Sequence, residues 1–458
     1  MDTMAIIMAA GEGRRMLSDK PKVLHEACGR PIIDWVIDAV SPCITACPVV
    51  VVGNGAQQVR AHLGTGVQYA FQDKQMGTGH AAMTAAPHLE GRKGYVLVVA
   101  GDVPLLKADS LAALCGLAKE GGYAATMLTA LMEDPSGYGR VVRSEGGSVA
   151  AVVEHRDADA QVMCIKEVNA SVYCFEIEAF LRALKSLKND NDQSEYYLTD
   201  CIAILVQEGR KVGALVASDA RECMGVNDRA QLAEAVKVLQ ERIIRRHQLA
   251  GVTFIDPQNT CVGCGVSIGR DTVVYPGNVL EGETRIGENC TIYPGSRIKN
   301  SVVGNGATIE SSVVCGSVVG DGANVGPFAH LRPGTDVGES CRIGNFVEVK
   351  ESRIGRASKV SHLTYVGDGI IGEGCNIGCG VVFVNYDGSQ KHTTVVEDGA
   401  FVGCNANLIS PVTVGKNSYI AAGSTITEDV PEDALAVARG RQINKEGWSA
   451  KRRMEKRK

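Results

Sequence analysis

The chain has 458 residues, a formal net charge of −5 and 45% hydrophobic residues. The slightly acidic balance argues against bulk nucleic-acid binding, and the length predicts more than one domain, each large enough for its own core. No stretch approaches the roughly 20 apolar residues that a membrane span requires. The first apolar run, Met4 to Ala10, is too short for a secretory signal and continues into Gly11 rather than into a cleavage site. We therefore expect a cytoplasmic protein.

The sixteen cysteines are scattered along the chain. Without a signal peptide, this distribution favours reduced thiols over a disulfide framework. Cys261-Val-Gly-Cys264 has no matching second pair, so a zinc site is not favoured there.

Residues 1 to 228 alternate short β-branched runs with helical patterns. The predicted strands are Met4–Ala10, Val49–Val52, Val67–Ala70, Tyr95–Ala100, Ala124–Ala130 and Val212–Val216. The predicted helices are Pro31–Val40, where Pro31 suits the first helical position, Ala56–His62, His80–Ala86 and Ser110–Lys119. This alternation predicts an α/β domain with a parallel sheet covered on both faces. Such sheets bind ligands beyond the carboxyl ends of their strands.

A glycine-containing loop follows the first predicted strand. It reads Gly11-Glu12-Gly13-Arg14-Arg15, and Lys20-Pro21-Lys22 comes shortly after. Glycines let backbone N–H groups approach a phosphate, and Arg15 and Lys22 add positive charge. The loop lacks the third glycine of a dinucleotide fingerprint and the Lys-Ser/Thr of a P-loop. An ordinary tight turn remains the alternative to a triphosphate-binding loop.

A second candidate lies at the end of the run Tyr95–Ala100, in Gly101-Asp102-Val103-Pro104. Magnesium prefers a few hard oxygen ligands and often shares its site with substrate phosphates. Asp102 is therefore a predicted metal ligand. The alternative is a carboxylate that caps the following helix, near Asp109.

Residues 229–249 carry apolar side chains at helical spacing. These are Leu232, Val236, Leu239, Ile243 and Ile244. The pattern predicts one long amphipathic helix that connects two domains.

The second half repeats an apolar residue every six positions. One block of such anchors is Ile268, Val274, Leu280, Ile286, Ile292 and Ile298, and two further blocks begin at Val319 and Val396. A small residue such as Cys290, Cys341 or Cys375 often precedes the anchor by two positions. A period of six predicts a parallel β-helix over residues 252–427, with three units in each coil and the small residue at the turn. A glycine-rich β-sandwich is the alternative.

The period of six has interruptions. One-residue slips at Val303, Ile354 and Ile371 are interpreted as local bulges. The gap from about Val384 to Val395 predicts a loop that projects from the prism, and such loops often carry function.

Several motifs of the first half resemble those of sugar-1-phosphate nucleotidyltransferases. They are Ala9-Ala10-Gly11-Glu12-Gly13-Arg14-Arg15-Met16, Lys20-Pro21-Lys22-Val23-Leu24 and Gly101-Asp102-Val103-Pro104-Leu105. Further matches are Gln72, Gly77-Thr78-Gly79-His80, Gly137-Tyr138-Gly139-Arg140, Val153-Glu154-His155, Glu195 to Asp200 and Gly225-Val226-Asn227. With the hexapeptide half attached, nearly the whole chain resembles the bifunctional GlmU family.

The resemblance implies a Rossmann-like nucleotidyltransferase domain (residues 1–228), a connector helix (229–249) and a left-handed parallel β-helix acetyltransferase domain with a basic tail (250–458). It also implies two reactions. Acetyl-CoA N-acetylates glucosamine 1-phosphate, and UTP with Mg²⁺ then converts the product to UDP-N-acetylglucosamine, releasing pyrophosphate. This product feeds peptidoglycan and lipopolysaccharide synthesis. A homotrimer is implied, and neither nucleic acid nor membrane is expected as a partner.

The resemblance also assigns residues in the first half. The implied UTP and UDP-sugar ligands are Ala9, Ala10, Gly11, Arg15, Lys22, Gln72, Gly77, Thr78, Gly101, Gly139, Glu154, Asn169 and Asn227. Asp102 and Asn227 would ligate Mg²⁺. The family often has Asn-Thr-Gly where this chain reads Asn169-Ala170-Ser171, and Tyr-Gly-Asp where it reads Ala100-Gly101-Asp102.

In the second half, His362 would be the general base of acetyl transfer, although a single histidine on a solvated face is often inert. The implied amino-sugar ligands are Arg332, Lys350, Tyr365 and Asn376. The implied acetyl-CoA ligands are Cys379, Asn385, Tyr386, Cys404, Ala422 and Arg439. The family more often has Ala and Ser at the positions of Cys379 and Cys404. The basic tail from Lys445 would contact the phosphates of CoA, or else is a solvated arm.

Two other functions compete with this interpretation. One is a single-activity sugar nucleotidyltransferase whose β-helix serves only in trimerisation or regulation. His362, Asn385-Tyr386 and Arg439 argue against it, because a scaffold needs none of them. The other is a nucleotide-sugar sensor, against which the presence of both Asp102 and Asn227 argues.

Overall fold

The computed structural model describes residues 2–191 and 193–456. The chain forms two compact units that divide between Gln240 and Glu241. This division falls inside one helix, α8 (Arg229–Leu249), which has the bounds that the apolar spacing predicts. Within the described residues, no helix has both the length and the apolar character of a membrane span.

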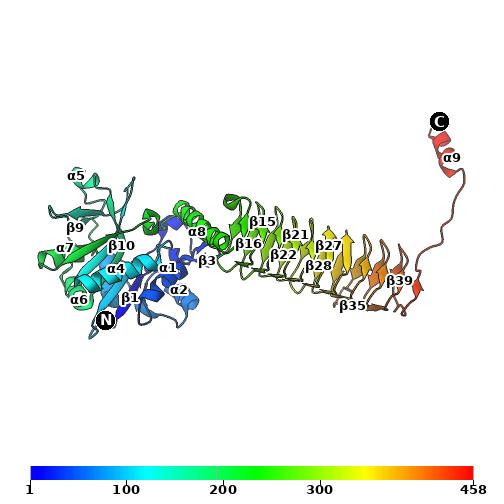
Figure 1. The fold of residues 1–458 in the computed structure, drawn as a ribbon, viewed down its shortest axis with the longest axis horizontal. Helices are drawn as coiled ribbons and strands as arrows, with labels where there is room; N and C mark the ends of the chain where they lie inside the picture. Colours follow the sequence, from blue (N-terminus) through cyan, green and yellow to red (C-terminus); the bar gives the residue numbers. More distant parts are fainter. Residues whose placement is uncertain (1, 192, 457–458) are drawn as a thin grey trace. The chain divides into compact units, whose positions relative to one another are not determined.

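The first unit is built on a sheet that includes β1 and β10 (Figure 1), and the central path of this sheet runs β11-β7-β10-β6-β1-β4-β5. These strands are β1 (Thr3–Met8), β4 (Val49–Val52), β5 (Gln68–Phe71), β6 (Tyr95–Ala100), β7 (Ala125–Leu131), β10 (Glu167–Glu176) and β11 (Val212–Val216). A hairpin of β8 (Arg140–Arg143) and β9 (Val149–Val153) extends from β10, and β2 (Glu26–Ala27) pairs separately with β3 (Arg30–Pro31).

The sheet is mixed: the pairs β1–β4, β1–β6, β4–β5 and β7–β11 are parallel, as predicted, but the expectation of a parallel sheet fails at β10. Strand β10 pairs antiparallel with both β6 and β7. The chain returns from β7 through the β8–β9 hairpin without a crossover helix, so its direction must reverse. The run Asn169-Ala170-Ser171 interrupts the apolar pattern of β10, and its pairing with β7 is irregular there, which explains why the sequence did not predict this strand.

Helices cover both faces of the sheet. They are α1 (Ile32–Val40), α2 (Ala56–Leu63), α3 (Thr78–Ala85), α4 (Ala108–Gly121), α6 (Ile177–Ser186) and α7 (Asp200–Gln207), and a short α5 (Ala160–Met163) follows β9. Helices α1, α2 and α4 cover one face, and α3, α6 and α7 cover the other. Helix α1 begins one residue later than predicted, because Pro31 has an extended backbone and precedes the helix.

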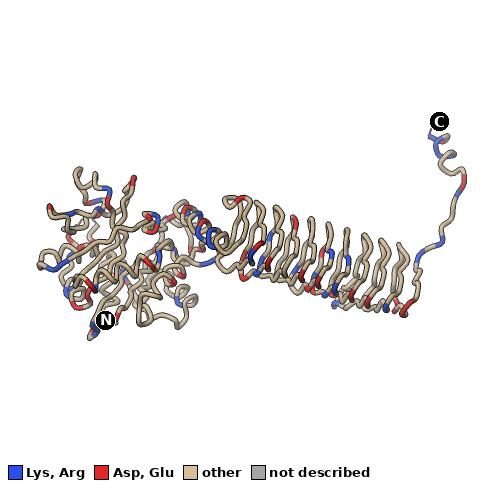
Figure 2. Tube along the Cα trace, in the orientation of Figure 1, with Lys and Arg blue, Asp and Glu red and all other residues tan. Residues whose placement is uncertain are grey.

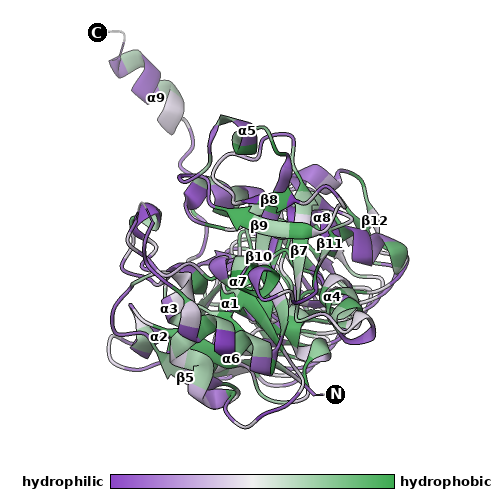
Figure 3. Ribbon diagram, turned by 90° about the vertical axis from the view of Figure 1, so that its left-hand side faces the viewer, coloured by the Kyte–Doolittle hydropathy of each residue, from purple (hydrophilic) through white to green (hydrophobic). Residues whose placement is uncertain are grey.

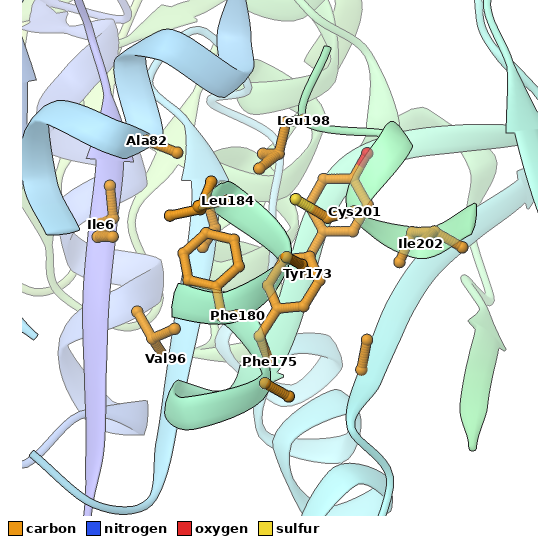
Figure 4. Close-up of a cluster of buried hydrophobic side chains, with 14 of the residues drawn as sticks. Ile6, Ala82, Val96, Tyr173, Phe175, Phe180, Leu184, Leu198, Cys201 and Ile202 are labelled. Atoms are coloured by element: carbon orange, nitrogen blue, oxygen red, sulfur yellow. The ribbon is translucent and has the colours of Figure 1, made fainter. Parts of the chain in front are cut away.

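The core beside α6 is centred on stacked aromatic rings (Figure 4). The ring centroids of Phe175 and Phe180 lie 4.4 Å apart, and those of Tyr173 and Phe175 lie 5.4 Å apart. Hydrophobic residues concentrate on the sheet strands (Figure 3), as expected for strands buried on both faces. This packing fixes the strand ends that carry the candidate ligands.

The second unit is a parallel β-helix of three parallel sheets, as the six-residue repeat predicts. The first sheet runs from β12 (Thr253–Phe254) to β41 (Leu435–Ala436), the second from β13 (Cys261–Val262) to β40 (Thr425–Ile426), and the third from β14 (Ser267–Ile268) to β38 (Val412–Val414). The apolar anchors point inward and are buried. Glycine after an anchor permits close stacking of coils, since a Cβ on Gly355 would lie 2.5 Å from the carbonyl carbon of Gly372.

The one-residue slips are shortened corners rather than bulges. Val273 pairs with Thr291, 18 positions later, whereas Arg297 pairs with Val313, only 16 positions later. Pairing in these sheets stays regular. Each slip follows a corner residue with a left-handed backbone: Asn300 (φ 48°), Glu351 (φ 44°) and Asp368 (φ 49°). The predicted loop lies between β34 (Val382–Val384) and β35 (Thr394–Val396).

The small residues before the anchors also connect the coils. The Ser358 hydroxyl donates to the Gly372 carbonyl (2.7 Å) and accepts from the Cys375 N–H (2.8 Å). Cys375 makes the equivalent hydrogen bond, since its thiol donates to the Glu397 carbonyl oxygen at 3.0 Å. All sixteen cysteines are among the described residues, and none forms a disulfide. Burial raises the pKa of the Cys375 thiol, which keeps it protonated as a donor.

Replacing Ser358 by Ala should lower the free energy of unfolding by about 1–3 kcal/mol, because a buried carbonyl and a buried N–H lose their partner. Chemical denaturation of the whole chain measures this loss. Ser358→Cys is the matched control and should cost less, since cysteine already serves at Cys375. Equal losses for the two variants would show that this hydrogen bond does not stabilise the coil.

Candidate functional site

Two adjoining cavities, of about 350 and 270 Å³, lie at the carboxyl ends of β1 and β6 in the first unit. They share five lining residues: Met8, Thr78, Ala100, Asp102 and Glu195. The smaller cavity contains the predicted nucleotide ligands Ala9, Ala10, Gly11, Lys22, Gln72, Gly77 and Thr78. The larger one contains the predicted sugar ligands Gly139, Glu154 and Asn169, together with Asn227. The structure thus brings both predicted groups to one edge of the sheet.

Two predicted nucleotide ligands do not line these cavities. Arg15 lies in a short 3-10 turn after the glycine loop, and its side chain is exposed. Gly101 is buried behind Asp102, where a Cβ would lie 3.0 Å from the Met8 carbonyl oxygen. Gly101 therefore permits β1 and β6 to end close together, which is a backbone role.

Asp102 and Asn227 converge on the ammonium group of Lys22. Lys22 Nζ donates to the Asp102 carboxylate, and it lies 3.2 Å from Oδ1 of Asn227. The Val226 N–H also donates to the Asp102 carbonyl (2.8 Å), which holds the two loops together. Asp102 does not cap helix α4, since the residue at that position is Lys107. These contacts favour cation binding over the capping alternative.

The donor set at this point fits magnesium. One carboxylate and one amide oxygen are hard ligands, and substrate phosphates commonly complete such sites. Within residues 2–191 and 193–456, no cluster of three or more His, Cys, Asp or Glu side chains could hold a metal by itself. A metal held by Asp102 and Asn227 would therefore need oxygens from a ligand.

The larger cavity contains a partly buried acid, Glu154. Burial raises the pKa of Glu154, and the nearby Asp157 and Asp200 carboxylates raise it further, whereas the Thr199 hydroxyl, donating at 3.1 Å, lowers it. In the same cavity, the Asn169 amide donates to the Tyr173 hydroxyl (2.6 Å). Ser171, where the family often has glycine, has a left-handed backbone (φ 55°).

Backbone geometry shapes the smaller cavity. Gly77 has φ 99°, and a Cβ there would lie 2.5 Å from the Tyr196 carbonyl oxygen, so only glycine fits. The buried Gln72 side chain donates to the Gly77 carbonyl (3.2 Å). The Thr78 hydroxyl accepts from the Leu198 N–H (3.0 Å). The bond between Leu198 and Thr78 attaches the segment around Gly77 to the segment around Tyr196.

Sequence reasoning gave no individual role to several cavity residues. Gln75 donates to the Ala10 carbonyl (2.7 Å) and so supports the glycine loop, while Glu195 lines both cavities. Thr199 holds Glu154. Glu195 and Thr199 belong to a matched motif, which was the available signal, but only the folded chain reveals which members face the cavity.

In the second unit, basic side chains gather on the second sheet of the β-helix. Arg332 and Lys350 occupy equivalent positions on successive coils, after β25 (His330–Leu331) and at the end of β28 (Glu348–Lys350). Lys391 from the projecting loop joins them, and its ammonium, with Arg332, lowers the pKa of Lys350. The sequence did not predict Lys391. Arg332 also pairs with the Glu348 carboxylate (2.8 Å), and the remaining positive charge of this group suits an anion such as a phosphate.

Beside this group, Tyr365 in β31 (Tyr365–Gly367) meets the base of the projecting loop. The Asn385 amide lies 3.5 Å from the Tyr365 hydroxyl and donates to the Asp368 carboxylate. Tyr386 is exposed and pairs with Lys391 across the loop. Asn376 lies on a different sheet, in β33 (Asn376–Ile377), so this chain alone does not group it with Arg332 and Lys350.

His362 begins a column of predicted acetyl-CoA ligands along the β-helix. It ends β30 (Lys359–His362) and is exposed, and its Nδ1 lies 2.6 Å from Oδ1 of Asn345. Backbone hydrogen bonds join the segments that carry His362, Cys379, Cys404 and Ala422 on successive coils. The guanidinium of Arg439 then donates to the Ala422 carbonyl (2.8 Å). Positions far apart in the sequence thus form one line.

The tail after Arg439 is exposed and basic (Figure 2), and it includes helix α9 (Trp448–Glu455). The final residues of the predicted basic run, Arg457 and Lys458, lie outside the described residues.

Comparison with known proteins supports both units. Residues 5–145 match the model of the MobA-like NTP transferase domain, and residues 265–300, 316–351 and 393–428 match that of the bacterial transferase hexapeptide. The chain is 52% identical to the bifunctional protein GlmU of Geobacillus sp. (strain WCH70), covering 97% of each chain. It is 50% identical to the same protein of Clostridium kluyveri over 100% of both chains. The chain belongs to the GlmU family.

Family membership agrees with the resemblance seen in the sequence. The match to Clostridium acetobutylicum GlmU, 50% identical over 98% of each chain, likewise spans both units. Both cavities of the first unit and the column of the second therefore lie within sequence shared with GlmU proteins.

Replacing Glu154 by Gln should change how stability depends on pH. Folding raises the pKa of this acid, so its contribution to stability falls as pH rises from the unfolded value of about 4.3 through the folded value. The variant should lose less stability than the parent chain over this range and be the more stable of the two at pH 8. Denaturation midpoints between pH 4 and 8 measure the difference. Exposed Glu178, changed to Gln, is the control; parallel curves for Glu154→Gln and the parent would contradict the expectation.

Proposed function

We propose that this chain makes UDP-N-acetylglucosamine in two steps at two separate sites. Acetyl-CoA first N-acetylates glucosamine 1-phosphate, and UTP then transfers its uridylyl group to the product. The observation that carries the proposal is that each unit has its own set of functional side chains, and the two sets differ in chemistry. The first unit has a cavity bordered by the side-chain oxygens of Asp102 and Asn227. The second has an exposed imidazole on one sheet of the β-helix and a cationic cluster on another.

Uridylyl transfer requires little proton chemistry. An oxygen of the sugar phosphate attacks the α-phosphorus of UTP in line, the bond to the bridging oxygen breaks, and pyrophosphate leaves. The attacking oxygen is already ionised, so catalysis consists of bringing two polyanions together and neutralising charge. We propose Mg²⁺, held by Asp102 and Asn227, as part of this neutralisation. Lys22, which already contacts both side chains, supplies a second positive charge.

The arrangement of the two cavities supports an assignment of the substrates. We assign the uridine of UTP to the smaller cavity, where Ala10, Gly11, Gln72 and Gly77 present backbone and amide groups. The sugar belongs in the larger cavity, beside Glu154 and the other predicted sugar ligands. Asp102 borders both cavities, so the two phosphates would meet beside it. Arg15 is exposed near the loop and is assigned to the outer phosphates of UTP.

Acetyl transfer poses a proton problem. The ammonium group of glucosamine must lose a proton before its nitrogen can attack the thioester carbonyl, and the CoA thiolate then leaves. A positioned base contributes roughly 10² to 10⁴ in rate. We assign this role to His362. Arg332 and Lys350, with Lys391 nearby, would hold the sugar phosphate, and Tyr365 and Asn376 would hold the sugar.

The column from His362 to Arg439 supports an extended acetyl-CoA site. It crosses four coil spacings, and strands lie about 4.8 Å apart, so it is roughly 19 Å long. Cys379, Cys404 and Ala422 would border the pantetheine chain, and Arg439 would meet a phosphate. Asn385 and Tyr386 would contact substrate from the projecting loop. The basic tail is a further candidate for the CoA phosphates.

We also propose that the active unit is a homotrimer. In one copy, His362 and the cationic cluster lie on an open surface. Phe328, Phe346 and Leu363, on three successive coils next to His362, are each more than half exposed. Burial of this apolar row by a neighbouring copy would enclose the site and could bring Asn376 of one copy to another copy's sugar.

The alternative is a single nucleotidyltransferase activity with a β-helix that serves only as a scaffold. The cationic cluster and the His362 column favour the two-reaction proposal, because trimerisation requires neither. In this proposal residues 1–228 carry uridylyl transfer, residues 250–458 carry acetyl transfer, and residues 229–249 connect them. Mass spectrometry of one mixture of glucosamine 1-phosphate, acetyl-CoA, UTP and Mg²⁺ detects both products. Failure to detect the acetylated sugar phosphate would favour the alternative.

His362→Ala should reduce acetyl transfer by about 10²- to 10⁴-fold and leave uridylyl transfer from supplied N-acetylglucosamine 1-phosphate near normal. The physical reason is loss of the proton acceptor from one site only. His330→Ala, which removes another exposed histidine of the β-helix, is the matched control and should retain both activities. Equal loss of both activities in the His362 variant would argue against two independent sites.

Asp102→Asn should have the opposite effect. Uridylyl transfer should fall by about 10²- to 10³-fold, because charge at the phosphates is no longer neutralised by a carboxylate-bound cation, and acetyl transfer should persist. Pyrophosphate release measured over a range of Mg²⁺ concentrations reports the change. Exposed Asp109, changed to Asn, serves as control. Unchanged Mg²⁺-dependent release would remove Asp102 from the metal site.

A further inference from the structure

We infer that Asn345 is a positioning residue for acetyl transfer, which acts by fixing the tautomer and orientation of the His362 imidazole. The inference rests on the proposed role of His362 as general base. Its evidence is the 2.6 Å separation between Oδ1 of Asn345 and Nδ1 of His362. The two residues are paired directly across neighbouring strands, β27 (Arg342–Asn345) and β30.

The local backbone places these two side chains next to each other. β27 and β30 are each four residues long, whereas neighbouring strands of the same sheet, such as β24 (Asn324–Val325), have two residues. The extra length carries the pairing out to Asn345 and His362. Gly344 permits it, because a Cβ there would overlap the carbonyl oxygen of Ser361. The Leu363 N–H also donates to the Asn345 carbonyl (3.1 Å), which fixes the backbone on both sides of the pair.

The chemistry follows from the amide oxygen. Oδ1 of Asn345 can only accept, so the proton of a neutral His362 lies on Nδ1 and the lone pair lies on Nε2. Nε2 is then the atom that can take a proton from the substrate ammonium. The opposite tautomer would place the lone pair against Asn345, where no substrate proton can reach it. A neutral amide orients the ring without adding a charge that would stabilise the imidazolium.

Other side chains do not provide this support. Among the described residues, the imidazole of His362 makes its hydrogen bond with Asn345, and no carboxylate bonds to it. His392, in the projecting loop, differs, since its Nε2 lies 2.7 Å from the Asp387 carboxylate. His362 thus has a neutral partner on Nδ1, whereas His392 has a charged one. An orienting partner of this kind is a recurrent element of sites in which histidine moves a proton.

A double-mutant cycle on the full chain tests the inference. Asn345→Ala should lower kcat for acetyl transfer about 10- to 100-fold. Without its partner the imidazole ring can rotate, and a displacement of about 1 Å of a reacting group can lower the rate about 10²-fold. KM for acetyl-CoA and for glucosamine 1-phosphate should change less than threefold, and uridylyl transfer should be unchanged. In the His362→Ala background, Asn345→Ala should have no further effect.

Two variants serve as controls. Asn345→Asp keeps an acceptor oxygen for Nδ1 of His362 and should restore most of kcat. Asn324→Ala removes an exposed asparagine from the same sheet and should change neither activity.

The outcomes separate the inference from the proposed function. If His362→Ala retains acetyl transfer, the assignment of the base is wrong. If His362→Ala abolishes it but Asn345→Ala lowers kcat by the same factor in both backgrounds, Asn345 does not act through His362 and the inference fails. An Asn345→Ala variant with unchanged kcat would overturn the inference in the same way.

Discussion

The close stacking of successive coils is the constraint on which the second unit depends. Each coil must place its backbone within hydrogen-bonding distance of the next, which requires glycine at positions such as Gly355 and a small donor at positions such as Ser358. Once this requirement is met, equivalent residues of successive coils form a column, in which neighbouring residues lie about 4.8 Å apart. The column from His362 to Arg439 and the cationic cluster at Arg332 and Lys350 are both consequences of that spacing. The candidate site residues of the second unit thus come from outward-pointing positions of the repeat and from the projecting loop.

The first unit obtains its site from a different constraint, which is that parallel strands end at the same edge. β1 and β6 deliver the glycine loop and Asp102 to that edge, and the antiparallel β10 adds Asn169 from its amino end. The contact between Lys22 and both Asp102 and Asn227 joins three segments remote in sequence. The two units therefore present two kinds of candidate site: a cavity with charged groups at a sheet edge, and an exposed imidazole on the surface of the β-helix.

Much of this arrangement could be predicted from residue patterns. Six-residue periodicity gave the β-helix and its loop, and alternating apolar runs gave most strands and helices of the first unit. The errors have local causes. β10 was missed because Asn169 to Ser171 interrupts its apolar pattern, and the slips at Val303, Ile354 and Ile371 proved to be shortened corners because a left-handed residue can replace a longer turn. Asn376 and Arg15 match family motifs, but in a single chain neither lies with the other predicted ligands of its substrate.

The sequence by itself determined the two-unit organisation, the class of each fold and the motifs of the GlmU family, because periodicity and short motifs are properties of consecutive residues. Only the tertiary structure decided that Asn345 faces His362, that Lys391 joins Arg332 and Lys350, and that Gln75 and Thr199 support the cavities. These contacts depend on coil register and on the order of strands in a sheet. Both are set by long-range hydrogen bonding and packing, which no local pattern encodes.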